Sequence, residues 1–112
     1  MARFAPQHLS YSVQDALWYK FCQVLTRLKN ADDIHRFLKD LLKRQERMMF
    51  IRRLEIARML HQGKTYREIA QKLKTTHATI GRVQRWLEFG REGYKRAIAH
   101  LLAIERNARP HS

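Results

Sequence analysis

The residues best suited to chemistry in this sequence form a short run of small and polar side chains. The run comprises Thr76, His77, Ala78, Thr79 and Gly81. It follows a polar stretch that interrupts an apolar pattern, so it is expected at the start of a helix. The first turn of such a helix can dock on a partner, which in DNA-binding proteins is the major groove.

The sequence lacks the residue patterns of an enzyme or a metal site. Its histidines form no HxxxH pair and no cluster with Cys22, and they stand at positions 8, 35, 61, 77, 100 and 111. Zinc sites need such pairs, and nucleotide-binding enzymes need a glycine-rich phosphate loop, which is also missing. No Ser, His and Asp set can be singled out. We therefore expect no catalysis, no metal and no cofactor.

Two short helices with one shared core are predicted around the run. Thr65 and Glu68 have the spacing of a capping box, so a helix should begin at Tyr66. Thr76 can cap the second helix. The inward positions are expected at Ile69, Ala70 and Leu73 in the first helix and at Ile80, Val83 and Leu87 in the second. Residues 65–89 thus have the form of a helix-turn-helix, with an ordinary helical hairpin as the alternative.

One residue departs from the usual pattern of this motif. The position after Leu73 is normally glycine, because the chain there turns in the left-handed region, but this chain has Lys74. If the turn is kept, the lysine side chain costs about 1 kcal/mol.

Four further helices are predicted, with no strand and no repeat. They are expected over residues 13–28 with Ser12 as cap, from Asn30 or Asp32 to Leu42, over 44–62 with Gly63 after the end, and over 94–107 beyond a turn at Gly90 and Gly93. The fold is therefore expected to be all-α. Residues 1–11 read as a flexible basic arm, residues 12–107 as one domain, and Cys22 as a buried thiol.

The helix over 44–62 carries more apolar surface than one chain of this size can cover. Apolar residues surround most of its circumference, and the helix is about 28 Å long. We therefore expect an intertwined homodimer in which a second subunit completes the cover. Arg53 interrupts this surface, and its guanidinium must either extend to solvent or meet an anion.

The charge of the chain favours a polyanionic partner. There are 23 Lys and Arg residues against 10 Asp and Glu, a net charge of +13. Most of the excess lies from Lys43 onward, the part that holds the helix-turn-helix. Basic charge alone would also suit ribosomal RNA or anionic lipid. No apolar run approaches the ~18 to 20 residues that span a bilayer, and a secretory signal is missing, so we expect a cytoplasmic protein with no membrane partner.

The stretch from Arg53 to Gly90 resembles the Trp repressor superfamily, and most closely its YerC/YecD-type members. It reads RLEIARMLHQGKTYREIAQKLKTTHATIGRVQRWLEFG, and the match lies in RLEIAR, a glycine, TYREIA and ATI-x-R-V before a closing glycine. The resemblance covers roughly Val13 to Ile98. It implies a bacterial protein with a six-helix fold that forms an interlocked homodimer, binds operator DNA with two recognition helices and regulates transcription as a repressor.

Carried over position by position, the resemblance implies two sets of contacts with double-stranded DNA. Arg67 matches an arginine that reaches a guanine in the Trp repressor, and its forked donors suit guanine O6 and N7. The residues placed toward base edges are Arg67, His77, Ala78, Thr79 and Gly81, and those placed at phosphates are Lys72, Lys74, Thr76, Arg82 and Arg85. For His77 the alternative is a solvated residue of the first turn.

The resemblance also places a possible effector pocket at Arg53, Arg82, Val83 and Trp86. In the Trp repressor the indole of tryptophan lies between two arginines, whose positions match Arg53 and Arg82. Val83 stands where the repressor has a glycine that leaves space for the ligand, and Trp86 replaces a serine near the ligand's amino group. Added volume and a lost polar partner disfavour the ligand. We expect DNA binding without tryptophan as corepressor, and another small-molecule effector stays open.

Two other functions share parts of this pattern. A basic helical module could bind DNA or RNA without sequence choice, which the positive charge supports equally and the small, polar recognition surface supports less. The DNA-recognition part of a transposase shares the motif, but its nuclease carboxylates would have to be on another chain.

Overall fold

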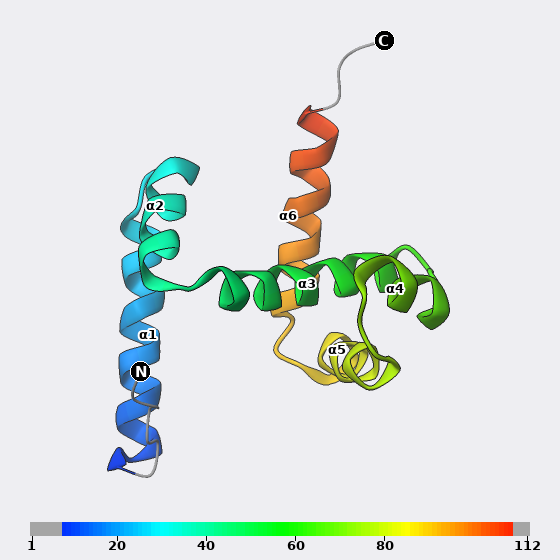
Figure 1. Cartoon of the computed structure of the whole chain (residues 1–112). Helices are drawn as coiled ribbons and strands as arrows, with labels where there is room; N and C mark the ends of the chain where they lie inside the picture. Colours follow the sequence, from blue (N-terminus) through cyan, green and yellow to red (C-terminus); the bar gives the residue numbers. More distant parts are fainter. Residues whose placement is uncertain (1–7, 109–112) are drawn as a thin grey trace. The chain divides into compact units, whose positions relative to one another are not determined.

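The computed structural model describes residues 8–108, and within them the chain forms six α-helices and no strand (Figure 1). The helices are α1 (Tyr11–Arg27), α2 (Ala31–Leu41), α3 (Arg44–His61), α4 (Tyr66–Leu73), α5 (His77–Phe89) and α6 (Gly93–Ala108). The predicted all-α fold is confirmed. The chain divides into two compact units, one ending at Lys43 and one beginning at Arg44. None of the helices in residues 8–108 is long and apolar enough to cross a membrane.

The first helix begins earlier than predicted. Ser10, and not Ser12, is its N-cap, because the N–H of Val13 donates to Ser10 Oγ (3.3 Å). The side chain of Gln14 also donates to the carbonyl oxygen of Leu9 (2.8 Å). This second bond holds the chain just before the helix, so the first turn forms two residues sooner. Residues 1–7 of the predicted N-terminal arm lie outside the described part of the chain.

The first unit joins α1 to α2 through aromatic rings. Asn30 caps α2, as one of the two predicted starts. The ring centroids of Phe21 and Phe37 are 5.9 Å apart, and Trp18 packs on Phe21 at 5.5 Å. No residue of α1 or α2 is buried, and Cys22, predicted as a buried thiol, is only half-buried. Over residues 8–43 the chain therefore has no core of its own.

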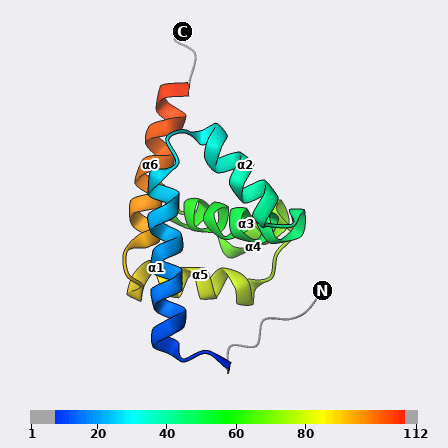
Figure 2. The same ribbon diagram turned by 90° about the vertical axis from the view of Figure 1, so that its left-hand side faces the viewer.

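The second unit is built around the C-terminal half of α3. Helix α3 contacts α4, α5 and α6, and α5 also contacts α4 and α6. Figure 1 shows α4 and α5 together near one end of α3, with α6 crossing α3. In the view turned by 90°, α5 lies below α3 (Figure 2). The buried residues are Ile56, Ala57, Met59, Ile69, Ile80, Val83 and Ile98. Every helix of the unit contributes to this core, so apolar packing holds α4 and α5 in place.

The N-terminal half of α3 is exposed, in contrast to its C-terminal half. Met48, Met49, Phe50 and Ile51 are between 44 and 53% exposed. Four neighbouring apolar side chains of this size form a larger accessible patch than scattered surface residues do. Within the second unit, the apolar surface of this half of the helix is uncovered.

Glycines stand at the helix ends where the backbone requires them. Gly63 follows α3 as predicted and has a φ of 81°. Gly90 caps the end of α5, where a Cβ would collide with the backbone carbonyl of Trp86. Helix α6 begins at Gly93, one residue before the predicted start, and ends one residue beyond the predicted end. Differences of this size reflect the fraying of helix ends.

Helix α4 begins with the predicted capping box. The N–H of Glu68 donates to Thr65 Oγ1 (3.1 Å), and the N–H and hydroxyl of Thr65 donate to Glu68 Oε1 (3.1 and 3.0 Å). The backbone hydrogen bond from Thr65 lowers the pKa of the Glu68 carboxyl below its usual 4.5, and the Thr65 hydroxyl and the charge of Lys64 lower it further. The charged carboxylate is therefore the form that stabilises the helix start.

We predict that Glu68→Gln removes a pH-dependent part of the stability. A carboxyl with a lowered pKa in the folded state stabilises the fold above its unfolded-state pKa and loses that contribution as the pH falls through the folded-state value. The thermal midpoint of the wild type should exceed that of Glu68→Gln at neutral pH, and the difference should shrink in acid. Thr65→Ala keeps the backbone N–H that donates to Glu68 and removes only the hydroxyl. In this background the thermal midpoints with Glu68 and with Glu68→Gln should therefore still differ at neutral pH, but by less. A difference that is equal at every pH would contradict the role of the charge.

Candidate nucleic-acid interface

The helix-turn-helix holds α5 by its buried side. A three-residue turn, 74–76, joins α4 to α5. The facing residues Ile69, Ile80 and Val83 are at most 1% exposed. The other predicted inward positions, Ala70, Leu73 and Leu87, are half-buried against the same core. The predicted inward faces are confirmed, and the first turn of α5 faces outward.

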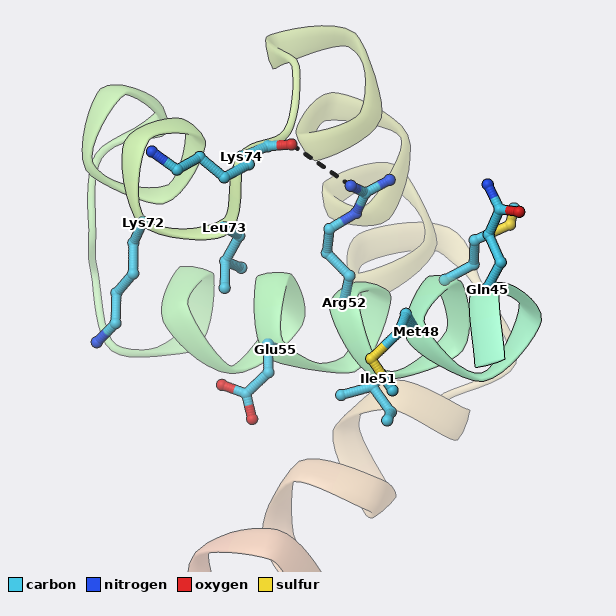
Figure 3. Close-up of a pocket in the computed structure, with 9 residues that line it drawn as sticks. Gln45, Met48, Ile51, Arg52, Glu55, Lys72, Leu73 and Lys74 are labelled. Atoms are coloured by element: carbon cyan, nitrogen blue, oxygen red, sulfur yellow. Dashed lines mark hydrogen bonds between the residues drawn. The ribbon is translucent and has the colours of Figure 1, made fainter. Parts of the chain in front are cut away.

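Lys74 makes the sharp turn between the two helices. Its φ and ψ are 53° and 51°, the left-handed conformation in which this motif usually has glycine. The N–H groups of Lys74 and Thr75 donate to the carbonyl oxygen of Ala70. From α3, Arg52 donates through Nη1 to the carbonyl oxygen of Lys74 (3.4 Å; Figure 3). The turn is thus tied to both α4 and α3.

Thr76 caps α5 as predicted. Its Oγ1 accepts from the N–H of Thr79 (3.2 Å), and its hydroxyl donates to Thr79 Oγ1 (3.1 Å). The Thr76 hydroxyl therefore both accepts and donates a hydrogen bond within the helix start. The Thr79 hydroxyl only accepts there, so its O–H can still donate a hydrogen bond to another group. This arrangement favours Thr79 over Thr76 as the hydroxyl that meets a partner.

All the residues predicted to contact DNA lie on α4, on α5 or in the turn between them. Among those predicted at base edges, Arg67, His77 and Ala78 are exposed, and Thr79 and Gly81 are half-buried. Those predicted at phosphates are all exposed, namely Lys72, Lys74, Thr76, Arg82 and Arg85. The structure therefore brings both sets onto one small motif.

The carboxylates near this motif are bonded to other groups. Glu68 belongs to the capping box, Glu88 accepts from Gln84 Nε2 (3.2 Å), and Glu55 pairs with Arg58 at 2.9 Å. None of these three carboxylates pairs with the lysines and arginines predicted at phosphates. The positive charge of those side chains is thus available to a polyanion.

A hollow of about 470 Å³ adjoins the turn (Figure 3). Its lining combines apolar side chains with three cations, which are Met48, Met49, Ile51 and Leu73, and Arg52, Lys72 and Lys74. Figure 3 shows Lys72 and Lys74 on the α4 side and Arg52 on the α3 side. The hollow connects the exposed apolar half of α3 with the cationic edge of the helix-turn-helix.

The residues of the predicted effector pocket are only partly brought together. Val83 is 1% exposed within the core, whereas Arg82 is exposed on α5. Trp86 stacks on Tyr94 of α6, with centroids 6.5 Å apart and ring planes at 17°, and both rings line a hollow of about 580 Å³. Burial raises the pKa of Tyr94, and the charge of Arg53 opposes that shift. Arg53 thus lies near this aromatic pair, but neither arginine nor Val83 lines the hollow.

Three contacts at this surface were not predicted, because the partners in each are not neighbours in the sequence. Arg52 and Lys74 are 22 residues apart. Tyr66, predicted only as the start of α4, donates its hydroxyl to Gln84 Oε1, 18 residues away, and its ring meets the His77 ring edge-on at 5.7 Å. Spacing and periodicity detect only local partners. The one available signal is the tyrosine itself, since a buried phenol usually finds a hydrogen-bond partner.

Comparisons with known proteins agree on one family. A sequence profile for the Trp repressor protein matches residues 16–102. YerC of Bacillus subtilis, described as uncharacterized, is 39% identical over 78 residues, which cover 70% of this chain and 75% of YerC. The crystal structure of a TrpR-like protein from Eubacterium eligens matches with a TM-score of 0.69 and 35% identity, covering 74% of this chain and 86% of that one. A candidate Trp repressor from Staphylococcus aureus matches with a TM-score of 0.66 and 31% identity, covering 88% of this chain and 95% of that one. The predicted resemblance is confirmed.

We predict that Lys74→Gly stabilises the fold. Glycine adopts the left-handed conformation without the Cβ penalty, so the free energy of unfolding should rise by up to about 1 kcal/mol. Lys72→Gly is the matched control, because the same change inside α4 should lower it by about 1 kcal/mol. Urea denaturation of both variants measures the two signs. If Lys74→Gly destabilises the fold as well, the lysine side chain and not its backbone conformation governs the turn.

Proposed function

This chain belongs to the Trp repressor family, and we propose that it is a transcriptional regulator that binds specific double-stranded DNA through α4 and α5. The observation that carries the proposal is the first turn of α5. This turn is outward-facing, small and polar, and it stands on a buried core, while exposed cations lie on the same two helices and in the turn between them. Such a turn fits the major groove, where base edges present donors and acceptors.

We assign base recognition to the exposed face of the two helices. Arg67 offers two parallel donors, which suit guanine O6 and N7. Ala78 can touch a thymine methyl group, and the free O–H of Thr79 can donate to a base or a phosphate. His77 and Gly81 belong to the same face, and an added Cβ at Gly81 would lie 3.8 Å from the hydroxyl of Tyr66.

We assign the remaining cations to the phosphate backbone. Lys72 and Lys74 stand at the end of α4, and Arg82 and Arg85 stand on α5. Their contacts would set affinity and register, not base choice. Thr76 belongs to the same set through its position, although its hydroxyl is used in the cap of α5.

We further propose that the protein acts as an interlocked homodimer. Several large apolar residues of the first unit and of α3 are each more than half exposed, namely Leu17, Trp18, Tyr19, Phe50 and Ile51. So much accessible apolar surface is unusual on a monomer. A second copy offers the same surface in return, as a two-fold axis requires. In such a dimer the two units would complete the single domain predicted over residues 12–107.

We propose that this regulator does not use tryptophan as its corepressor. Val83 fills its position and is packed into the core. Trp86 is stacked on Tyr94 and leaves no small hydroxyl at the position that matches the family's serine. Removing either residue from these contacts to admit a ligand would cost packing energy. Arg53 and Arg82 would then serve the fold and the DNA backbone.

Selection from a random DNA library with the purified protein tests the proposal, and we predict an enriched motif. Arg67→Ala should weaken binding to that motif by about 1 to 3 kcal/mol and relax the choice at one base pair. Lys72→Ala should instead weaken all sequences alike and lower the slope of log affinity against log salt by about 0.9.

The opposite outcomes point to the alternative function. If no motif is enriched, or if both substitutions act equally on motif and random DNA, the protein is a basic module that binds DNA or RNA without sequence choice, as its net charge of +13 would allow. L-tryptophan should leave the affinity unchanged. A rise of about tenfold, or 1.4 kcal/mol, would show that Arg53 and Arg82 form a corepressor site.

We predict that the protein sediments as a dimer at micromolar concentration. Ile51→Glu places a charge in the proposed interface, so it should yield monomers or abolish folding. Phe89→Glu is the matched control, because this side chain is 81% exposed on α5 outside the proposed interface, and it should remain a folded dimer. Analytical ultracentrifugation with circular dichroism distinguishes these states. A folded wild-type monomer would rule out the dimer.

A further inference from the structure

Tyr66 is the first residue of α4 and reaches across to α5. It follows the capping box, so the backbone there is held by Thr65 and Glu68. Its side chain is half-buried and packs against the apolar core. A tyrosine anchored in this way has little freedom of its own, and it can therefore restrain what it touches.

The side chain of Tyr66 contacts three positions along one face of α5. Its ring meets the His77 ring edge-on, with centroids 5.7 Å apart and planes at 86°. Its hydroxyl lies beside Gly81, where an added Cβ would be 3.8 Å away. The same hydroxyl donates to Gln84 Oε1. Spacings of four and three residues place these positions above one another on a helix, so one phenol spans two turns of α5.

The hydrogen bond continues beyond Gln84. Its Nε2 donates to Glu88 Oε1 (3.2 Å), so both ends of the Gln84 amide are used. An amide held at its oxygen and its nitrogen has a defined orientation. The partner of the Glu88 carboxylate is thus the neutral Gln84 amide and not a lysine or arginine. The cations of α5 therefore stay available to the polyanion that this helix is proposed to approach.

The ring contact with Tyr66 restrains the exposed side chain of His77. A side chain in the first turn of a helix is otherwise free to change rotamer, and it loses that freedom when it binds. An edge-on contact between two rings restricts the rotamer before binding takes place. His77 and Gly81 are both on the face assigned to base edges, so the position of Tyr66 bears directly on base choice.

We propose that Tyr66 is a positioning residue for sequence recognition: its ring fixes His77 and its hydroxyl fixes Gln84 on α5. The inference rests on the proposed DNA-binding function. It adds that affinity for the preferred sequence depends on Tyr66, whereas affinity for DNA in general does not. Tyr66 itself acts through its neighbours and needs no contact with DNA.

Two substitutions separate the hydroxyl from the ring. Tyr66→Phe should weaken binding to the enriched motif about three- to tenfold, the size expected for one lost hydrogen bond, and leave binding to random DNA unchanged. Tyr66→Leu should in addition broaden the preference at the base pair that His77 faces. Tyr94→Phe is the matched control, because it removes a phenol oxygen from α6 outside the helix-turn-helix, and both affinities should stay at wild-type values.

The hydrogen bond from Tyr66 to Gln84 and the ring contact with His77 are tested by two different measurements, DNA affinity and NMR chemical shifts. Gln84→Ala should weaken motif binding, and adding Tyr66→Phe to it should have little further effect, since both changes break the same bond. Without DNA, the ring-proton NMR shifts of His77 should move in Tyr66→Leu and stay in Tyr66→Phe. These shifts report the ring contact directly and do not depend on the proposed function.

Three results would overturn the inference. In the first, Tyr66→Phe binds the motif as well as the wild type does. In the second, it loses motif and random DNA in parallel with a lower thermal midpoint, which would make Tyr66 a merely structural residue. In the third, the His77 shifts are the same in wild type and Tyr66→Leu. A wild-type protein that enriches no motif would overturn the proposed function together with this inference, so the two failures are distinguishable.

Discussion

The burial of Ile56, Ile69, Ile80 and Val83 in one cluster is the interaction on which the second unit depends. Each such side chain contributes about 1.5 to 3 kcal/mol when it is fully removed from water. Helix α4 has eight residues, fewer than the ~12 to 15 at which an isolated helix becomes even marginally stable. It is therefore helical because Ile69 is packed against its neighbours. The same packing sets the direction of α5 and presents its first turn.

Polar residues at the starts of α4 and α5 stabilise these helices in addition to the core. Thr65 with Glu68 and Thr76 with Thr79 satisfy backbone N–H groups that have no partner inside the helix. Hydroxyls used in this way are withdrawn from binding, whereas the exposed cations around them are not. The motif thus separates groups that hold the backbone from groups that remain available to a partner. Lys74 belongs to both sets, because its backbone forms the turn and its side chain carries a charge.

The two units of the chain obtain their stability in different ways. The second unit has a buried cluster, whereas no residue of α1 or α2 is buried. Helices with apolar faces and no core need a partner surface, and within the second unit the apolar N-terminal half of α3 is uncovered as well. In the proposed homodimer these surfaces would cover one another. Folding and association would then be linked, so that the stability of the fold depends on protein concentration.

The sequence by itself determined the local features. The capping box, Gly63 after α3 and the turn at Lys74 depend on contacts within a few residues, so spacing predicts them. Spacing could not decide whether Ser10 or Ser12 caps α1, since the hydroxyl of either serine suits an N-cap. Apolar periodicity also predicted the inward faces of α4 and α5. The resemblance of Arg53 to Gly90 to the Trp repressor superfamily predicted the family. Only the tertiary structure decided that Tyr66 holds Gln84, that Arg52 holds the turn and that Arg53 lies near Tyr94. These groups meet because the core folds distant segments together, and no periodic pattern encodes which side chains then come within hydrogen-bond reach.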